Sequence, residues 1–322
     1  MPRVLYIGAP EASAACFSAM AHAALPGLDF AAVDGRAAAL PLAADCEAMI
    51  GHHFQFDDEL VSRAPKLRWV QSLTTGTDQI VQLKSLGPQV TVTSTRGMHG
   101  PQMSELVFLH MLALARDFPR MQRNQAAAEW QRWPQPLLSG KTAVVVGVGA
   151  IAEALAPRCK AFGMTVHGVS STPRAIAGFD HVHTRSQLAQ AAALADFLIL
   201  IVPLSADTEN LIDASVIAAM KPSAYLINAA RGGVLDEEAL LAALREKRIA
   251  GAGLDVFRQQ PLPPTSPFWH EPGVIVTPLV GGMSDIYLQQ AFPTVEANLR
   301  CFMEGRLNQM HNLVARSAAT NP

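Results

Sequence analysis

The sequence predicts an α/β protein made of two Rossmann-like, doubly wound domains with parallel sheets. Short apolar runs alternate with helical stretches along most of the chain. From residue 142 onward these runs are apolar nearly throughout, which is typical of parallel strands buried on both faces. A glycine-rich turn directly follows the first run of that series. The 322 residues are enough for two domains, and half of them are hydrophobic, which is enough for substantial cores.

The first third of the chain is expected to alternate strands with helices. Residues 4–7 suit a strand, and the alanine-rich stretch 12–25 suits a helix. Further apolar runs that predict strands are 29–33, 47–50, 67–72 and 90–93. Between the last two of these, the polar stretch 74–78 is expected to form a turn that exposes backbone amides.

The middle of the chain predicts one buried helix and one connecting arm. Residues 104–115 are apolar on nearly every face, so this helix could pack between two domains. We expect Ser104 to cap it and Glu105 to lie in its first turn, where a carboxylate is favourable. Residues 130–138 carry two tryptophans and two prolines and are expected to form a connecting arm.

A regular pattern of strands and helices begins at residue 142. The strands are expected at 142–146, 165–169, 197–202, 224–227, 253–256 and 274–277. The stretch 286–302 predicts a long final helix that could return to the first domain. The chain therefore predicts a second doubly wound domain with a parallel sheet covered on both faces.

Composition and charge argue against several classes of protein. The formal net charge of −2 lacks the basic excess of a general nucleic-acid binder. Four widely separated cysteines fit neither a disulfide framework nor a zinc site, so we expect no metal and a reducing, cytoplasmic location. No leader and no membrane-spanning stretch are expected, because no apolar run has the required length.

The glycine turn after residue 146 has the pattern of a dinucleotide-binding turn. Gly147 permits the tight turn, and Gly149 lets a pyrophosphate approach the backbone. The helix start at Ala150 and Ile151 offers amides and the positive end of a helix dipole. Ala152 stands at the third glycine position, which the pattern tolerates. The alternative is a structural turn in an unrelated doubly wound domain.

The second strand of this series ends without the acidic residue that usually binds the ribose of NAD. Ser170, Ser171 and Arg174 follow that strand, and they could accept a 2′-phosphate instead. We therefore expect NADP or NAD as cofactor, with NADP favoured. Alternatively, Arg174 is a solvated surface residue.

Beyond the glycine turn, the sequence resembles the D-isomer-specific 2-hydroxyacid dehydrogenases. The resemblance covers essentially the whole chain and is most specific between residues 147 and 282. It rests on Val202-Pro203-Leu204 with Thr208, on residues 220–222, 227–236 and 253–257, and on Thr277-Pro278 with Gly281-Gly282.

This resemblance implies a discontinuous, flavodoxin-like substrate domain interrupted by a dinucleotide-binding domain. We place the substrate domain at residues 1–103 and 287–322, and the NAD(P)-binding domain at 104–286. The resemblance further implies an active site between the domains and a homodimer. The implied reaction is hydride transfer between nicotinamide and C2 of a small 2-oxo or 2-hydroxy acid, a small carboxylate substrate.

The resemblance also assigns roles to individual residues. Arg231 matches the arginine that binds the substrate carboxylate and polarises its carbonyl, a task that suits a planar, permanently charged guanidinium. The alternative for Arg231 is a structural ion pair. Thr75 and Gly76 match the turn whose amides hold the carboxylate, and Asp255 matches the residue that contacts the nicotinamide carboxamide. Further matched cofactor-binding positions are Val202, Pro203, Thr208, Ala229, Ala230 and Gly281.

Two positions at the chemical centre depart from the family pattern. The family His follows Thr-Pro, but here Leu279 stands in that place and cannot carry a proton. The family Glu precedes a proline, but here that residue is Gln260, which cannot ionise. The two changes agree with each other, because a buried Glu without its imidazole partner would be an uncompensated charge. The site lacks the usual general acid, which contributes about 10²–10⁴ in rate.

Three hypotheses follow from these departures. In the first, the protein is a reductase with a relocated proton donor, and His99 in the hinge segment is the candidate; otherwise His99 is only a hinge or surface residue. In the second, it is a cofactor-binding protein that has lost catalysis and acts in protein interaction. In the third, it oxidises a formate-like substrate that needs no side-chain acid. Leu279 also suggests a substrate with an apolar substituent.

Overall fold

The computed structural model describes residues 3–172 and 174–315. These residues form two compact units. The first, here called the N-terminal unit, consists of Met1–Met98 and Met283–Pro322, and the second, the inserted unit, is His99–Gly282. The chain passes between the units after Met98 and again after Gly282. The expected boundaries, after residues 103 and 286, lie a few residues later.

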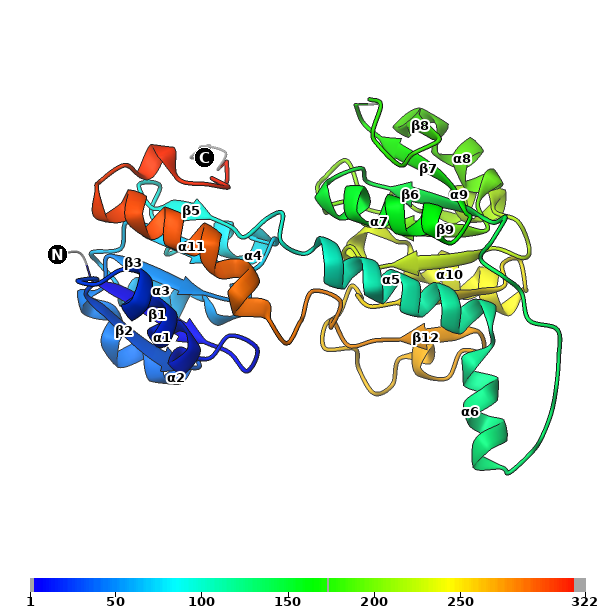
Figure 1. Cartoon of the computed structure of the whole chain (residues 1–322), viewed down its shortest axis with the longest axis horizontal. Coiled ribbons are helices and arrows are strands. Elements are labelled where there is room, and N and C mark those ends of the chain that lie inside the picture. The colour runs from blue at the N-terminus through cyan, green and yellow to red at the C-terminus, as the bar shows by residue number, and fades with distance from the viewer. Residues whose placement is uncertain (1–2, 173, 316–322) are drawn as a thin grey trace. The chain divides into compact units, whose positions relative to one another are not determined.

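The N-terminal unit is built on a five-stranded sheet in which every pairing is parallel (Figure 1). The strand order is β2-β1-β3-β4-β5, the order of flavodoxin-like folds. The sequence patterns located all five strands to within a few residues. Their bounds are β1 Val4–Gly8, β2 Phe30–Asp34, β3 Ala48–Gly51, β4 Trp69–Ser72 and β5 Thr91–Thr93.

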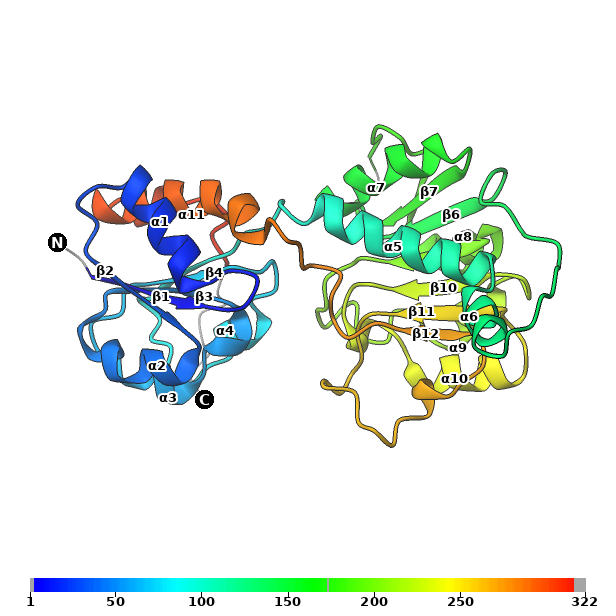
Figure 2. The same ribbon diagram turned by 60° about the horizontal axis from the view of Figure 1, so that its bottom comes forward.

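Helices cover both faces of this sheet (Figure 2). On one face, α1 (Ala14–Ala24) lies beside the last long helix, α11 (Tyr287–Met303), and the two share one apolar core. The sequence therefore correctly predicted that the chain returns to its first unit. The other face carries α2 (Arg36–Ala39) and α3 (Asp58–Ser62). The short helix α4 (Asp78–Val81) follows β4.

The inserted unit contains a seven-stranded sheet, again with every pairing parallel. The strand order is β12-β11-β10-β9-β6-β7-β8, the doubly wound order of dinucleotide-binding folds. The strands are β6 Thr142–Val146, β7 Thr165–Ser170, β8 His181–Thr184, β9 Phe197–Leu200, β10 Tyr225–Asn228, β11 Gly251–Leu254 and β12 Val274–Val276. Strand β8 was not predicted from the sequence, because this histidine-rich edge strand lacks the apolar run of a buried strand.

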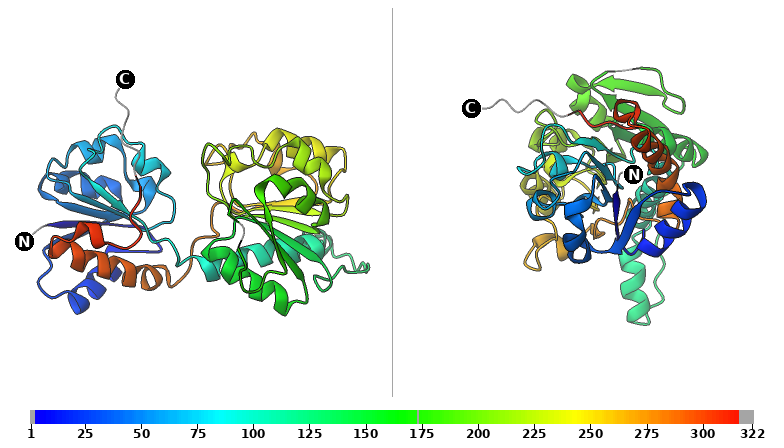
Figure 3. Two further views of the ribbon diagram at one scale, coloured as in Figure 1. Left: turned by 90° about the horizontal axis from the view of Figure 1, so that it is seen from above. Right: turned by 90° about the vertical axis from the view of Figure 1, so that its left-hand side faces the viewer.

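Both faces of the second sheet are also covered by helices (Figure 3, left). The long helix α5 (Gly100–Ala115) and α7 (Ala150–Ala161) pack together on one face. The opposite face carries α8 (Leu188–Leu194), α9 (Ala214–Ala219) and α10 (Glu237–Arg245). The amphipathic helix α6 (Phe118–Ala126) follows α5 and leads into an irregular arm at residues 130–138.

The prediction that Ser104 caps the buried helix was wrong. Helix α5 begins at Gly100, one turn earlier than expected, and His99 is its N-cap residue. Pro101 suits the first turn because a proline lacks the amide that would remain without a helical partner. The Ser104 hydroxyl lies inside the helix and donates a 2.6 Å hydrogen bond to the Gly100 carbonyl.

Short 3₁₀ turns complete the described secondary structure. They are η1 Leu40–Asp45, η2 His53–Gln55, η3 Arg185–Gln187, η4 Gly232–Val234, η5 Pro267–Trp269 and η6 Leu307–Gln309. Within residues 3–172 and 174–315, none of the helices combines the length and the apolar character needed to cross a membrane.

Candidate functional site

The inserted unit gathers the expected cofactor-binding residues at one edge of its sheet. Because all pairings are parallel, the carboxyl ends of the strands lie along the same edge. Gly147, Val202, Arg231 and Asp255 follow β6, β9, β10 and β11 respectively, and Ser170 is the last residue of β7. Doubly wound sheets bind their ligands at this edge.

The glycine turn after β6 has the space that a pyrophosphate needs. Gly147 has φ 99°, and a Cβ there would lie 2.8 Å from the Val202 backbone, so only glycine fits. A Cβ on Gly149 would meet no described atom within 4 Å, which leaves the backbone open to a ligand. No side chain of the described residues caps α7, which begins at Ala150. The exposed amides at this helix start therefore suit a phosphate group.

The loop after β9 holds its shape through one buried hydroxyl. Thr208 is 2% exposed, donates to the Pro203 carbonyl at 2.7 Å and accepts from the Ser205 amide at 2.7 Å. These bonds keep Pro203 exposed next to the glycine turn. Thr208 thus supports the loop from inside, while Val202 is buried against Gly147.

The turn after β7 carries the residues expected to select between NADP and NAD. The Ser170 hydroxyl accepts from the Thr172 amide at 3.2 Å, whereas Ser171 is exposed. The Arg174 guanidinium is 2.7 Å from the Glu153 carboxylate of α7, and both side chains are about half exposed. Arg174 therefore forms an ion pair that is exposed to solvent, and such pairs are weak. A bound phosphate would compete with Glu153 for the Arg174 guanidinium.

Arg231 lies three residues after the buried end of β10. The Asn228 side chain fixes this turn, because its amide donates to the Arg231 carbonyl at 3.2 Å and its oxygen accepts from the Ala230 amide at 3.1 Å. The Arg231 guanidinium donates to the Ala230 carbonyl at 2.8 Å and is partly exposed. Ala229 and Ala230 are buried behind it. The turn thus presents a guanidinium at the ligand-binding edge.

Asp255 orders the loop after β12. It is 2% exposed, and its carboxylate accepts from the Thr277 hydroxyl at 2.6 Å and from the amides of Val280 and Gly281 at 3.0 and 3.1 Å. The carboxylate thus holds this loop through three of its roughly four acceptor positions. The role that the resemblance assigns to Asp255 at the nicotinamide stays a prediction.

A buried histidine that the sequence analysis missed completes this arrangement. His110 of α5 is fully buried, and its Nε2 is 3.2 Å from the Thr277 hydroxyl. Because that hydroxyl donates to Asp255, we assign the Nε2 proton to His110 as donor. Burial lowers the pKa of His110, while the charge of Asp255 opposes this shift, so the ring is neutral at neutral pH. A polar residue on an otherwise apolar helix was the available sequence signal.

Thr277→Val should test the His110–Thr277–Asp255 chain. We expect the free energy of unfolding to fall by about 1–3 kcal/mol, because the change removes the partner of a buried imidazole N–H and one of the three donors to a buried carboxylate. Urea denaturation would show a lower midpoint at unchanged slope. Thr265→Val, at an exposed position of the same unit, is the matched control and should unfold like wild type.

The two departures from the family pattern both lie on the surface of the inserted unit. Leu279 is 43% exposed and has φ 56°, a left-handed conformation that is rare for a bulky residue. Its amide is 3.0 Å from the Asp255 carbonyl. Gln260 is exposed as well. The cost of an uncompensated carboxylate at this position stays a prediction.

His99 lies at the start of α5 and is 6% exposed. A Cβ on Gly282 would lie 3.5 Å from its imidazole Cδ2, so the ring packs against the end of the loop that Asp255 orders. The Gln102 amide donates to the Gly282 carbonyl at 3.4 Å. His99 is thus a buried residue at the first position of the inserted unit rather than a surface residue.

The N-terminal unit places Thr75 and Gly76 in a tightly bonded turn after β4. The Thr74 hydroxyl donates to the Gly76 carbonyl at 2.9 Å and is 2.9 Å from the Ser72 hydroxyl. Thr75 is exposed at the tip of the turn. The Nδ1 atom of His53, in the loop after β3, is 3.0 Å from the Thr74 hydroxyl oxygen. Sequence reasoning missed His53, although a polar residue directly after an apolar strand was the available signal.

A second histidine in the same loop has a different environment. His52 is 2% exposed, and its ring lies 5.3 Å from the rings of Phe54 and Tyr287. Burial is the main cause that lowers the pKa of His52 to about 4, so it is neutral at neutral pH. Its Nε2 is 3.3 Å from a Glu11 carboxylate oxygen, and the neutral state makes this a polar contact and not a strong ion pair.

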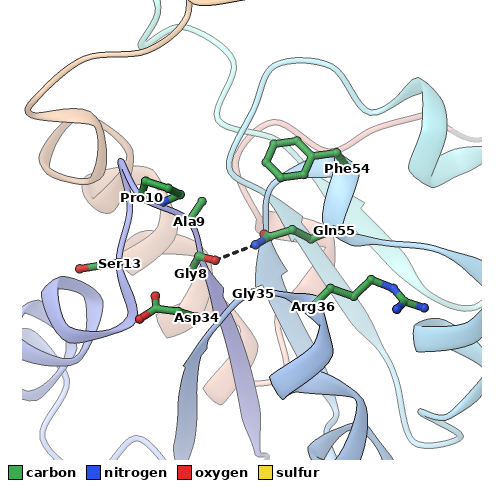
Figure 4. Close-up of a pocket in the computed structure, with 9 residues that line it drawn as sticks. All are labelled: Gly8, Ala9, Pro10, Ser13, Asp34, Gly35, Arg36, Phe54 and Gln55. Atoms are coloured by element: carbon green, nitrogen blue, oxygen red, sulfur yellow. Dashed lines mark hydrogen bonds between the residues drawn. The ribbon is translucent and has the colours of Figure 1, made fainter. Parts of the chain in front are cut away.

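The same sheet edge has a pocket of about 610 Å³ lined by the loops after β1, β2 and β3 (Figure 4). Its polar groups already have partners. The Asp34 carboxylate accepts from the Ala14 amide at 2.8 Å, and the Gln55 amide donates to the Gly8 carbonyl at 2.7 Å. Arg36 is paired with acidic residues of the α3 region. The charged side chains that line the pocket, Asp34 and Arg36, therefore already bind other groups of the N-terminal unit.

Within the described ranges 3–172 and 174–315, no cluster of three or more His, Cys, Asp or Glu side chains is arranged to hold a metal ion. The free cysteines are Cys16, Cys46, Cys159 and Cys301.

The inserted unit has the sheet order, glycine turn and uncapped helix start of a dinucleotide-binding protein. A family model described as "D-isomer specific 2-hydroxyacid dehydrogenase, NAD binding domain" matches residues 108–281. The chain belongs to the D-isomer specific 2-hydroxyacid dehydrogenase family, as its sequence resemblance implied. It is an NAD(P)-dependent 2-hydroxyacid oxidoreductase, with a nicotinamide dinucleotide as cofactor.

Relatives with assigned activities cover most of the chain. A glyoxylate reductase from Thermococcus litoralis is 34% identical over 82% of each chain. An (S)-sulfolactate dehydrogenase from Chromohalobacter salexigens is 36% identical over 80% of this chain and 84% of its own.

Solved structures of relatives have the same fold over nearly the whole chain. A D-isomer specific 2-hydroxyacid dehydrogenase family protein from Aeromonas salmonicida has a TM-score of 0.90 at 32% identity, covering 98% of this chain and 100% of its own. An NADPH-dependent glyoxylate/hydroxypyruvate reductase from Sinorhizobium meliloti, in complex with NADP and sulfate, has a TM-score of 0.82 at 28% identity, covering 98% and 99% of the two chains.

Proposed function

We propose that the protein transfers a hydride between NADP(H) and C2 of a small 2-oxo or 2-hydroxy acid, with Arg231 binding the acid. The observation that carries the proposal is the Arg231 guanidinium at the same sheet edge as the open glycine turn. A guanidinium suits this task because it stays charged and can donate two parallel bonds to a carboxylate. The names of the two curated relatives support a 2-oxo or 2-hydroxy acid as substrate.

Several groups of this chain would bind the cofactor and the acid. The amides at residues 149–151 would hold the pyrophosphate, and Ser171 with Arg174 would hold a ribose 2′-phosphate. Pro203, Ala229, Ala230 and Gly281 would border the nicotinamide half. When bound, the cofactor supplies or accepts the hydride. The amides of Thr75 and Gly76 would hold the substrate carboxylate.

The proton must come from a group other than the usual family histidine, because Leu279 stands at its position. Arg231 would stabilise the negative charge that develops on the carbonyl oxygen. His99 is the donor candidate that the hinge position suggests, and its ring packs against Gly282.

NADP preference rests on Arg174 and leads to a prediction about cofactor choice. Arg174→Ala should raise KM for NADPH about tenfold, because a charged partner of the 2′-phosphate is lost, and should leave KM for NADH nearly unchanged. Glu153→Gln should lower KM for NADPH, because it removes the carboxylate that competes for Arg174. Steady-state kinetics would measure KM for NADPH and for NADH in each variant. Equal changes for the two cofactors would contradict the assignment.

A screen of 2-oxo acids with NADPH and NADH tests the function itself. We expect reduction of at least one acid, with NADPH preferred. The panel should include acids with apolar substituents, since Leu279 is an exposed apolar side chain at this edge. Reduction of only the smallest polar acids would contradict the apolar preference. Cofactor binding without turnover across the panel would favour the alternative, a cofactor-binding protein acting in protein interaction.

We further propose that the protein is a cytoplasmic homodimer that binds neither nucleic acid nor membrane. The formal net charge of −2 supports the part that concerns nucleic acid, because a general nucleic-acid binder usually has a basic excess. The homodimer is what the family resemblance implies. Size-exclusion chromatography with light scattering would give the oligomeric state.

A further inference from the structure

The turn that carries Arg231 is supported by a carboxylate on the first residue of α10. We infer that Glu237 is a positioning residue for the reaction, because it fixes, through the turn after β11, the backbone from which the Arg231 guanidinium reaches the acid. This inference rests on the proposed function, since it concerns the same arginine. Every contact that carries it lies within the inserted unit.

The turns after β10 and β11 touch each other through their backbones at Gly232, the residue that follows Arg231. A Cβ on Gly232 would lie 1.9 Å from the Phe257 carbonyl carbon and 2.2 Å from the Arg258 amide nitrogen. The Phe257 side chain is buried, and its ring lies 5.8 Å from the ring of Phe268. The peptide between residues 257 and 258 therefore supports the backbone that carries Arg231.

Glu237 binds that same peptide. Its Oε1 atom accepts a 2.7 Å hydrogen bond from the Arg258 amide. Glu237 is partly buried, and burial is the main cause that raises the pKa of its carboxyl, whereas the Arg258 amide and the Arg258 charge oppose this rise. The Glu237 side chain is therefore turned toward the protein, where it holds the peptide on which Gly232 packs.

A second set of contacts ties the end of the Arg231 turn to the loop after β9. The Gly233 carbonyl accepts from the Asn210 amide at 2.8 Å and from the Arg258 guanidinium at 3.4 Å. The same guanidinium donates to the side-chain oxygen of Asn210. Arg258 thus contacts the Arg231 turn through both its backbone and its side chain, and Glu237 holds the backbone of Arg258 in place.

The proposed role of Arg231 makes its placement important. A planar guanidinium binds a carboxylate through two parallel hydrogen bonds, so a displacement of the turn weakens both of them. A misplacement of about 1 Å in an active site can cost about 10²-fold in rate. Glu237 acts only through the Arg258 amide and the Gly232 backbone, so it is a positioning residue and not a catalytic one.

Glu237→Ala in the full-length protein is the direct test, with the best acid from the screen. The change removes the acceptor of the Arg258 amide, so we expect kcat/KM for the acid to fall about tenfold. KM for NADPH should stay nearly unchanged, because the glycine turn after β6 and Arg174 are not part of these contacts. Equal losses for the acid and for NADPH would indicate general damage to the unit and would overturn the inference.

Glu238→Ala is the matched control. Glu238 lies in the same first turn of α10, so both carboxylates interact similarly with the helix dipole. Glu238 is exposed and makes no hydrogen bond or ion pair with another described residue, so this variant should keep wild-type kcat/KM.

Glu237→Gln separates position from charge. The glutamine keeps an oxygen that can accept from the Arg258 amide, so this variant should restore most of the kcat/KM lost in Glu237→Ala. A loss in Glu237→Gln as large as that in Glu237→Ala would show that the charge matters and not the hydrogen bond, and the positioning role would then be wrong.

An Arg231→Ala background tests whether Glu237 acts through Arg231. In that background, Glu237→Ala should cause no further loss of kcat/KM, because the group that it positions is already absent. A further tenfold loss would show that Glu237 acts by another route, and it would contradict the inference.

Hydrogen exchange separates this inference from the proposed function. The amides of Val234 and Leu235 donate to the Arg231 and Gly232 carbonyls at 3.2 and 3.1 Å. Both amides should exchange faster in Glu237→Ala than in wild type, and at the wild-type rate in Glu238→Ala. Faster exchange in a protein that reduces no 2-oxo acid would contradict only the proposed function. Turnover by wild type, with unchanged exchange and unchanged kcat/KM in Glu237→Ala, would contradict only the inference.

Discussion

Arg231→Ala is expected to lower kcat/KM for the best 2-oxo acid by a factor of roughly 10²–10³, because it removes the charged donor to the substrate carboxylate and to the developing negative oxygen. Arg231→Lys should retain part of the activity, since an ammonium keeps the charge but cannot reproduce the planar two-donor contact. Steady-state kinetics, with thermal unfolding as a check on folding, would measure both effects.

The matched control for this arginine is Arg248→Ala. Arg248 follows α10 in the same unit and makes an exposed ion pair with Glu246 at 2.8 Å. Exposed ion pairs contribute little to stability, so this variant should keep wild-type kinetics and stability. Full activity of Arg231→Ala would exclude a role for Arg231 in binding the acid. Equal losses in both variants would indicate a general loss of positive charge.

Gly232→Ala is expected to have the largest effect among substitutions that add a single methyl group. A Cβ at Gly232 would lie 1.9 Å from the Phe257 carbonyl carbon and 2.2 Å from the Arg258 amide nitrogen. Because both atoms belong to the backbone, the turns after β10 and β11 would have to move apart. Overpacking of this kind costs about 1–3 kcal/mol of unfolding free energy or more. Arg231, the adjacent residue, would move with the turn, so kcat/KM should fall as well.

Gly233→Ala is the control for this substitution, because it adds the same methyl group at the next residue. A Cβ at Gly233 would meet the end of the Leu204 side chain at 3.1 Å, and a leucine side chain can shift by the few tenths of an ångström required. Urea denaturation should therefore show a large loss of stability for Gly232→Ala and a small one for Gly233→Ala. Equal stability of the two variants would contradict the close contact between the turns.

The site divides into residues that sequence patterns located and residues that they did not. Arg231, Asp255 and the glycine turn follow apolar runs of the chain, and the carboxyl end of a parallel strand is where such a fold binds ligands. Their place at one sheet edge could therefore be predicted. Ser104 and His110 lie on an apolar helix whose start the pattern misjudged, so neither the cap at His99 nor the contact with Thr277 could be predicted.

The sequence alone was sufficient for the fold class, the strands of both sheets except β8, the return of the last helix and the family. The loss of the usual acid–base pair at Leu279 and Gln260 stays a prediction. Such features depend on local hydrophobic periodicity and on short contiguous motifs, which act within a few residues of chain. Side-chain partners depend on packing between distant segments. His53 meets Thr74, and Arg174 meets Glu153, each across 21 residues. Only the folded chain brings these groups within hydrogen-bond distance.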